Sequence, residues 1–526
     1  MKLKPLFLLI PLVWLSFSAV AQTHFVAGGI RYRIVREADE SMTVGLVHVA
    51  PMENGEYEGD VVIPNAVKSG AETYAETYKV VGIDEKAFAD CYDLESVTLP
   101  PSVETIGSMA FQNSPSLETV VIPYGNMTEI GNMTFFYSSI RSIEIPASVK
   151  GIRTSAFYNC RNLNSVVLPE GLEVLDGAAF ALCHSLSSIM IPGSVRVLGS
   201  SCFAHSGLTE IVFPEGIRVI PEAVCLGCQD LAKAVIPQSV REIGANAFGT
   251  CAHLTSIRLP SRLRIIGVNA FIASGLTQID IPGSVSDLSS AFRDCKSLTS
   301  VTLHDGLEHM SDYVFSGCPI QTIDLPSTLK TIGKACFEET ALTELRIPDS
   351  VTEIGERAFM DCQQLVSILL PSHLHALGAG AFSYTGLTQI DIPGTVAVLP
   401  DRCFFNCEQL TSVTLHEGLE VLGKSVFEHC PFQTVTFPST LKTLGEESFS
   451  NTGLSDFIIP KNVSSIGKEA FNNCSDLVKV DILAPLDTLD KAIFSRCYKL
   501  KSVTVHFPKG KAIHYPEDGL FRVVYD

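Results

Sequence analysis

The chain has 526 residues, a formal net charge of −19 and no cluster of Lys or Arg. It therefore lacks the basic surface that contacts nucleic-acid phosphates, and no nucleic-acid partner is expected. A globular chain of this length would divide into about three or four domains, yet one repeated pattern occupies nearly all of it.

The first 21 residues have the pattern of a secretory signal peptide. Lys2 and Lys4 precede an apolar run from Leu6 to Val20, and Ala19-Val20-Ala21 is a small-residue cleavage site. No later stretch approaches the roughly eighteen apolar residues of a membrane span. The sequence predicts an exported protein with no integral membrane segment after signal cleavage, either secreted or at the cell surface, with the periplasm as an alternative.

Residues 22–82 are predicted to form a β-rich N-terminal cap. Polar and apolar residues alternate in Ile30–Ile34 and in Thr43–Val47, as they do in strands with one buried face. Asp60–Pro64 already resembles a strand of the repeats that follow. A cap of this kind would cover the first layer of a repeat core.

Residues 83–507 contain about nineteen units of 22–23 residues, recognised by a recurring Ala-Phe or a close variant. Cys225 replaces the aromatic residue in one unit. The remaining units carry Phe88, Phe111, Phe135, Phe157, Phe180, Phe203, Phe248, Phe271, Phe292, Phe315, Phe337, Phe359, Phe382, Phe404, Phe427, Phe449, Phe471 and Phe494.

One unit illustrates the structure that the pattern predicts. Ile257 and Leu259 alternate with Arg258 in a short strand, which ends at Pro260 because proline cannot donate to a β-ladder. A glycine then allows a tight turn, and a short helical turn is expected to carry Phe271 into the core. Such units cannot bury their apolar residues alone, so they must stack into a solenoid with a continuous core.

The cysteines also follow the repeat. Three lie in the small column before Phe, and twelve follow Phe by three residues: Cys91, Cys160, Cys183, Cys228, Cys251, Cys295, Cys318, Cys362, Cys407, Cys430, Cys474 and Cys497. Their regular placement favours a ladder of buried free thiols, although disulfides between neighbouring units stay open. No column of His or carboxylates runs beside them, so neither a metal site nor a cofactor is predicted.

The repeat Ala-Phe-x-x-Cys-x-x-Leu-x-x-Val-x-Leu-Pro-x-x-Leu-x-x-Ile-Gly closely resembles the BspA-type leucine-rich repeat family. The resemblance spans approximately residues 83–508 and implies a right-handed, curved solenoid with a long parallel β-sheet on one face and short helical turns or loops on the other. It also implies a secreted or cell-surface protein involved in adhesion to proteins. Residues 508–526 would form a C-terminal cap or tail.

The sequence offers no catalytic constellation, because the same residue types are spread evenly along the repeats rather than gathered at one place. His304 and His416 both follow Thr-Leu and lie 112 residues apart. Gly275–Pro282 recurs at Gly386–Pro393 with nearly the same offset, so a block of repeats has been copied. Both histidines are therefore interpreted as repeated structural residues, and the chain as a non-enzyme.

The outward-facing residues of the strands form the candidate protein-binding face. Its apolar members in the first half are Val121, Val167, Met190, Val212 and Val235. Exposed apolar patches often mark partner surfaces, so we expect a protein-binding scaffold of the adhesin type. A self-associating structural protein of the envelope and a glycan-binding accessory protein are the alternatives.

Overall fold

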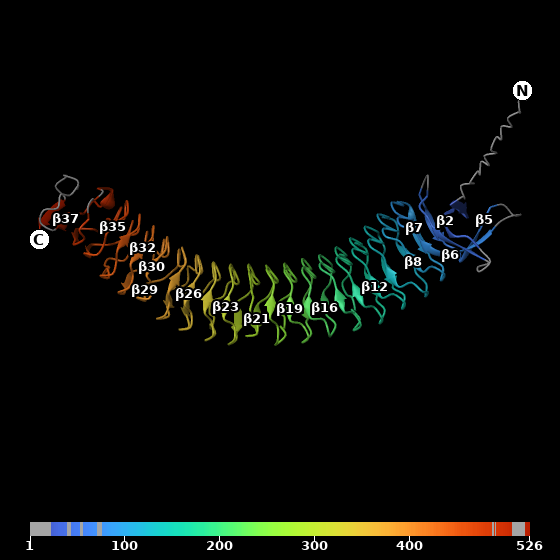
Figure 1. The fold of residues 1–526 in the computed structure, drawn as a ribbon, viewed down its shortest axis with the longest axis horizontal. Helices are drawn as coiled ribbons and strands as arrows, with labels where there is room; N and C mark the ends of the chain where they lie inside the picture. The colour runs from blue at the N-terminus through green and yellow to red at the C-terminus, as the bar shows by residue number, and fades with distance from the viewer. Residues whose placement is uncertain are drawn as a thin grey trace, which may run out of the picture.

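The computed structural model describes residues 23–38, 44–52, 56–70, 76–486, 489, 491–507 and 521–525. Its repeats stack into one long solenoid that curves as an arc, with both ends turned toward the same side (Figure 1). The predicted signal peptide, residues 1–21, lies outside the described residues, as does most of the predicted C-terminal tail.

Two series of parallel strands run along the solenoid, where the sequence predicted one sheet. The first series comes from the alternating segment of each unit and points its outer positions to solvent. Its members are β7 (Leu94–Thr98), β9 (Thr119–Val121), β11 (Ser142–Glu144), β13 (Ser165–Val167), β16 (Glu210–Val212), β18 (Lys233–Val235), β21 (Gln278–Ile281), β22 (Ser300–Leu303), β25 (Glu344–Arg346), β27 (Ser367–Leu369), β29 (Gln389–Ile392), β31 (Ser412–Leu415), β34 (Asp456–Ile459), β36 (Lys479–Ile482) and β37 (Ser502–Phe507).

The second series consists of two-residue strands that lie just before the turn carrying the phenylalanine position of the next unit. Its members are β8 (Thr105–Ile106), β10 (Glu129–Ile130), β12 (Gly151–Ile152), β14 (Val174–Leu175), β15 (Val197–Leu198), β17 (Val219–Ile220), β19 (Glu242–Ile243), β20 (Ile265–Ile266), β23 (His309–Met310), β24 (Thr331–Ile332), β26 (Glu353–Ile354), β28 (Ala376–Leu377), β30 (Val398–Leu399), β32 (Val421–Leu422), β33 (Thr443–Leu444) and β35 (Ser465–Ile466). Both series break into short sheets of two to six strands among the described residues, some of which include strands of the N-terminal or C-terminal segment.

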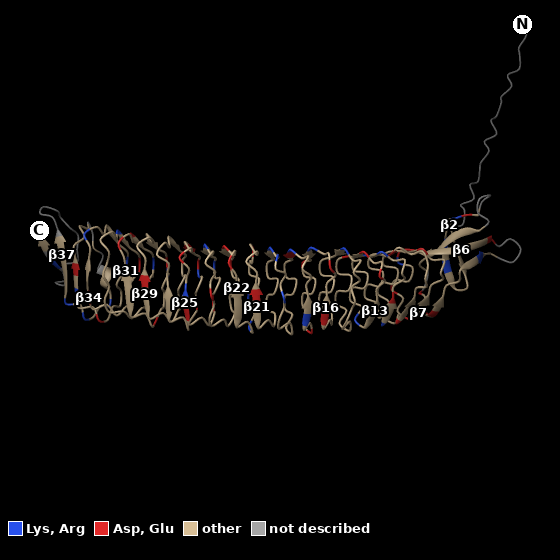
Figure 2. Ribbon diagram, turned by 90° about the horizontal axis from the view of Figure 1, so that it is seen from below, with Lys and Arg blue, Asp and Glu red and all other residues tan. Residues whose placement is uncertain are grey.

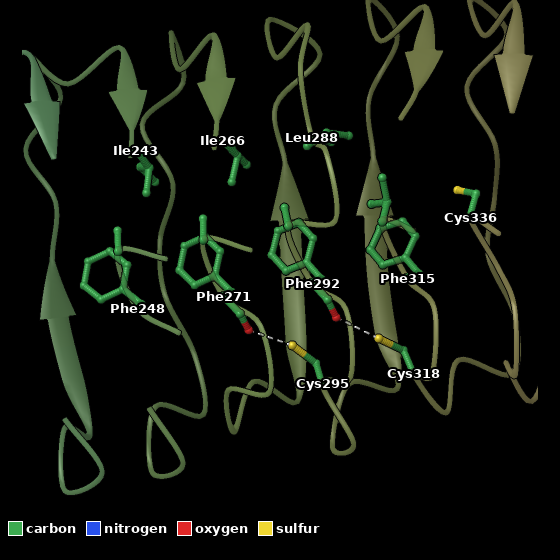
Figure 3. Packing of buried hydrophobic residues seen from close by; sticks show 14 of the residues in the cluster. Ile243, Phe248, Ile266, Phe271, Leu288, Phe292, Cys295, Phe315, Cys318 and Cys336 are labelled. Atoms are coloured by element: carbon green, nitrogen blue, oxygen red, sulfur yellow. Dashed lines mark hydrogen bonds between the residues drawn. The ribbon is translucent and has the colours of Figure 1, made fainter. Parts of the chain in front are cut away.

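The phenylalanine column forms the predicted buried spine. Ring centroids of neighbouring units lie 5.1–5.9 Å apart in near-parallel stacks, from Phe88 to Phe203 and from Phe248 to Phe494. Figure 3 shows this packing for Phe248, Phe271, Phe292 and Phe315. Where Cys225 interrupts the column, Phe213 approaches Phe248 edge-on at 6.1 Å.

The helical turns that the sequence predicted around each phenylalanine are not helices. The described chain contains one short helix, the 3₁₀ helix η1 (Lys491–Phe494). Elsewhere the residues two before and two after phenylalanine have positive φ, as in Asn269 (58°) and Ala273 (50°). The Phe271 N–H donates to the Ala291 carbonyl of the next unit at 2.8 Å. A helix cannot form here because its hydrogen bonds would have to run within the unit.

The N-terminal segment joins the solenoid through both strand series. β1 (His24–Ala27), β2 (Ile30–Arg36), β3 (Gly45–Val49), β5 (Ala66–Ser69) and β6 (Glu76–Ile83) form a mixed sheet, and β6 pairs with β8. β4 (Gly59–Val62) pairs in parallel with β7, at the strand-like segment predicted from the sequence. At the other end β38 (Phe521–Tyr525) pairs with β37.

Candidate functional site: the outer face of the first strand series

The outer positions of the first series form the candidate site. Each strand alternates buried and exposed residues, as in β16, where Glu210 and Val212 flank the buried Ile211. Parallel pairing places equivalent positions side by side, so that Val212 lies opposite Val235 and Glu144 opposite Val167. The face is therefore a regular array of side chains. The residue type at its outward positions can differ from unit to unit, because these side chains do not pack in the core.

Four consecutive outward positions are apolar and exposed. The exposed fractions are 55% for Val167, 81% for Met190, 49% for Val212 and 39% for Val235. We call these four residues the apolar stripe. Val121 is also exposed but lies apart from them, because the intervening unit carries Glu144, whose carboxylate accepts a hydrogen bond from Tyr124.

The apolar stripe borders a shallow depression of about 620 Å³. Its lining comes from three consecutive units and includes Ser165, Ile189, Met190, Val212 and Pro214. Residues 188–190 form no strand between β13 and β16. Met190 therefore lies at an interruption of the sheet, where a flexible, polarizable side chain can adapt to a partner.

The next five units have a polar outer face. Their outward residues are all exposed: Arg258, Asp280, Thr302, Asp324 and Arg346. We call these five residues the polar stretch. Figure 2 shows charged residues on β21 and β25, within this part of the face. A second depression of about 650 Å³ is lined here by Arg258, Asp280 and His304 among others.

The two histidines singled out by the repeat each pair with an aspartate of the preceding unit. His304 Nε2 lies 2.7 Å from Asp280 Oδ1, and His416 Nε2 lies 2.7 Å from Asp391 Oδ1. All four side chains are more than half exposed. The sequence contained the signal for these pairs, because both aspartates lie in the copied Gly275–Pro282 and Gly386–Pro393 segments.

The cysteine column is part of the core. All sixteen cysteines are free thiols; fifteen are buried and Cys497 is partly buried. Cys295 and Cys318 donate to the carbonyl oxygens of Phe271 and Phe292 in the preceding units, each at 3.0 Å (Figure 3). Burial raises the pKa of Cys160 to about 12, so this thiol stays protonated and is a poor nucleophile or metal ligand.

In the described part of the chain, no three His, Cys, Asp or Glu side chains are grouped so that they could hold a metal ion. Over the same residues, no helix is both long and apolar enough to cross a bilayer.

Several solved structures of repeat proteins are similar to this chain. A leucine-rich repeat protein from Bacteroides ovatus is 23% identical, with 95% of this chain and 99% of that chain covered and a TM-score of 0.34. The pneumococcal vaccine antigen PcpA is 17% identical, with 95% and 93% covered and a TM-score of 0.31. A leucine-rich cell surface protein from Faecalibacterium prausnitzii is 20% identical, with 92% and 94% covered and a TM-score of 0.27.

Among curated proteins none matches the chain. The profile of the BspA type leucine rich repeat region (6 copies) matches residues 77–185, 128–251, 173–291, 218–339, 288–411, 330–455 and 397–514. These overlapping matches cover the solenoid without a gap, and the resemblance seen in the repeat is thereby confirmed. The chain belongs to the BspA-type leucine-rich repeat family.

Proposed function

We propose that this protein is an exported, non-enzymatic scaffold that binds a protein ligand through the apolar stripe. The observation that carries the proposal is the run of four exposed apolar residues, Val167, Met190, Val212 and Val235, on consecutive units of one face. Burying such side chains contributes roughly 25 cal/mol for each Å² of apolar surface removed from water. A partner that covers the stripe would gain affinity without requiring any charged group.

Cell-surface or secreted location fits this role. The signal-like residues 1–21 would direct export, and a similar protein from Faecalibacterium prausnitzii is described as a leucine-rich cell surface protein. The proposed adhesin role is supported by family membership together with an accessible apolar surface. A solenoid adds one more strand position with each copied unit, so an enlarged face needs no new fold.

The proposal is tested by surface plasmon resonance of the chain from Gln22 onward over immobilised fibronectin, laminin, fibrinogen and collagen. Met190→Glu places a charge at the centre of the stripe and is expected to weaken binding at least tenfold, which is about 1.4 kcal/mol. Thr302→Glu adds the same charge within the polar stretch and serves as the matched control. Equal binding by wild type and Met190→Glu would exclude the stripe as the contact surface.

Self-association through the same stripe is distinguished by sedimentation velocity. If the wild-type chain forms dimers at micromolar concentration and Met190→Glu is monomeric, the stripe pairs with a second copy, and the structural alternative replaces the adhesin role. A monomeric wild type that binds none of the four matrix proteins would remove the support for this adhesin reading.

A further inference from the structure

A notch on the turns that precede the first strand series has the composition of a sugar-binding site. The turn after Phe382 is one residue shorter than its neighbours: Thr385-Gly386-Leu387 lies between Cys362-Gln363-Gln364-Leu365 and Cys407-Glu408-Gln409-Leu410. A short turn between two longer ones leaves a recess. The structure contains a pocket of about 340 Å³ at this place.

The lining of the notch combines one aromatic ring with planar polar side chains. Tyr384 and Asn406 each lie directly before a turn. Gln363, Glu408 and Gln409 come from the flanking long turns. Gly386 lies at the notch and keeps the turn close to the preceding unit, because a Cβ there would clash with the Gln363 carbonyl oxygen. Amides and carboxylates both accept hydrogen bonds, and amides also donate.

Tyr384 occupies a backbone position that suits a smaller residue. Its φ is 59°, in the left-handed region, and the equivalent position holds Asn159, Asn406 and Asn451 in some units but Leu182 and Glu339 in others. Asn adopts this conformation at lower cost than a bulky residue. The conformation recurs in every unit, so it fixes where the Tyr384 side chain leaves the backbone, and the case for a site rests on the side chains around it.

The ring of Tyr384 is held from one side and open on the other. It packs against Phe405 with centroids 5.5 Å apart and an interplanar angle of 70°, and the Arg402 guanidinium lies 5.5 Å from the Phe405 centroid. At the same time 37% of Tyr384 is exposed. The Phe405 ring thus packs against Tyr384, which remains partly exposed beside the polar groups of the notch.

We propose that this notch binds a neutral hexopyranose of an oligosaccharide. The C–H face of a pyranose stacks on an aromatic ring, and its vicinal hydroxyls fit the amides of Gln363, Asn406 and Gln409 and the carboxylate of Glu408. The pocket lies near the lower limit of roughly 300–1,000 Å³ for ligand sites, which suits one sugar ring. The carboxylate and the net charge of −19 disfavour an acidic sugar.

The assignment is to binding and not to hydrolysis. Glycoside hydrolysis ordinarily uses two carboxylates that flank the scissile bond. Glu408 is the one carboxylate among the described residues that line the notch. This inference is independent of the proposed protein-binding face, because none of the notch residues belongs to the apolar stripe.

A related turn shows what sets this notch apart. Tyr137 also has a positive φ of 61° and precedes a short turn, Ser138-Ser139-Ile140. Its flanking turns carry Pro115-Ser116 and Arg161-Asn162, where the Tyr384 notch has Gln363-Gln364 and Glu408-Gln409. The aromatic residue is repeated, but the set of amides and carboxylate is not.

Isothermal titration calorimetry of the chain from Gln22 onward with cellohexaose, chitohexaose, mannohexaose and maltohexaose tests the inference. Saturable binding of at least one hexasaccharide is expected, weakened at least tenfold by Tyr384→Asn and by Gln363→Ala. Tyr498→Asn removes a tyrosine that is 83% exposed outside the notch and should leave binding unchanged.

Thermal unfolding separates a binding role from a structural one. Because Asn suits a left-handed position, Tyr384→Asn should unfold at the wild-type temperature or above it, while Tyr384→Phe keeps the ring and should still bind. Absence of saturable binding to all four hexasaccharides would overturn the assignment, as would full binding by Tyr384→Asn. If Tyr384→Asn loses sugar binding but still binds a matrix protein, the notch and the apolar stripe act separately.

Discussion

The apolar stripe and the polar stretch present opposite surfaces over the same interior. Beneath the first lie Phe180 and Phe203, and beneath the second lie Phe271 and Phe292, all fully buried and stacked. The same phenylalanine column runs beneath both regions, interrupted once at Cys225 in the unit of Val235, whereas the outward residues change from Val and Met to Arg, Asp and Thr. In this fold the buried columns determine the architecture and the outward column is left to determine what the surface binds.

The two regions also differ in how their side chains interact with neighbouring side chains and with water. In the polar stretch Asp280 already contacts His304 of the next unit, and water solvates the rest. Exposed apolar side chains gain nothing comparable from water. The apolar stripe is therefore the region that gains more free energy when a partner covers it.

The largest expected effect concerns the buried phenylalanine column, which the two regions share. Phe180→Ala and Phe292→Ala should each lower the free energy of unfolding by about 3–5 kcal/mol, because each removes a buried ring and leaves a cavity. Urea denaturation followed by circular dichroism measures both. If one variant were destabilised by several kcal/mol more than the other, the two cores would not be equivalent.

A partly buried charge cluster in the N-terminal sheet provides a contrast with the exposed pairs of the polar stretch. Arg33 Nε donates to Asp84 Oδ2 at 2.6 Å, and His48 Nδ1 lies 3.0 Å from Asp84 Oδ1. Burial alone would raise the pKa of Asp84, but hydrogen bonds from Arg33 and His48 outweigh it and lower the pKa below its usual 3.8. Asp84→Asn should destabilise the sheet by about 1–3 kcal/mol.

The pH dependence of this loss follows from the lowered pKa. The Asp84 carboxylate contributes its full stability above about pH 3.8, and the contribution declines as pH falls from there toward the folded-state pKa. The difference in unfolding free energy between wild type and Asp84→Asn should thus shrink as pH falls below 3.8. A difference that grows in acid would contradict the assignment.

Ionic strength distinguishes which region binds a ligand. Binding through the apolar stripe should change little, within about threefold, between 50 and 500 mM NaCl, because salt screens charges and not apolar contacts. Binding through the polar stretch should weaken markedly over the same range. The affinity of any matrix protein that binds is measured at both salt concentrations, for wild type and for Met190→Glu. The comparison shows which of the two regions binds it.

The smallest expected effect concerns the exposed histidine pairs. His304→Ala and His416→Ala should each change the unfolding free energy by less than about 0.5 kcal/mol, since exposed ion pairs contribute little. Thermal unfolding at pH 7 measures this. A loss above about 1.5 kcal/mol would mean that these pairs stabilise the face more than their exposure indicates.

Much of the architecture was predictable because each buried position recurs. The phenylalanine spine, the thiol column and the outward orientation of Met190 all follow from the repeat period, and the structure confirms them. The turn conformation was not predictable, because residues as different as Asn269, Ala273 and Tyr384 occupy left-handed positions. Hydrogen bonds between units impose that conformation, and they are absent from any single unit considered alone.

The candidate surfaces were predictable only in part. Alternation identified which residues face outward, but the break in pairing at residues 188–190 depends on how neighbouring units stack. The Tyr384 notch arises from one short turn between two longer ones, none of which contains a recognisable motif. The His304–Asp280 contact joins residues from two units; the copied segments contain both residue types, but the contact itself depends on how the units stack.

The unit-to-unit stacking has a mechanical consequence. Each unit is connected to its immediate neighbours by ring stacking and by backbone hydrogen bonds. Examples are the stacked rings of Phe337, Phe359 and Phe382 and the hydrogen bond from the Phe359 N–H to the Ala381 carbonyl oxygen. A load applied to the two ends is carried by these contacts in series, so the weakest junction yields first while the others hold. Each unit that detaches would release about 75 Å of extended chain. The solenoid would thus lengthen stepwise under tension.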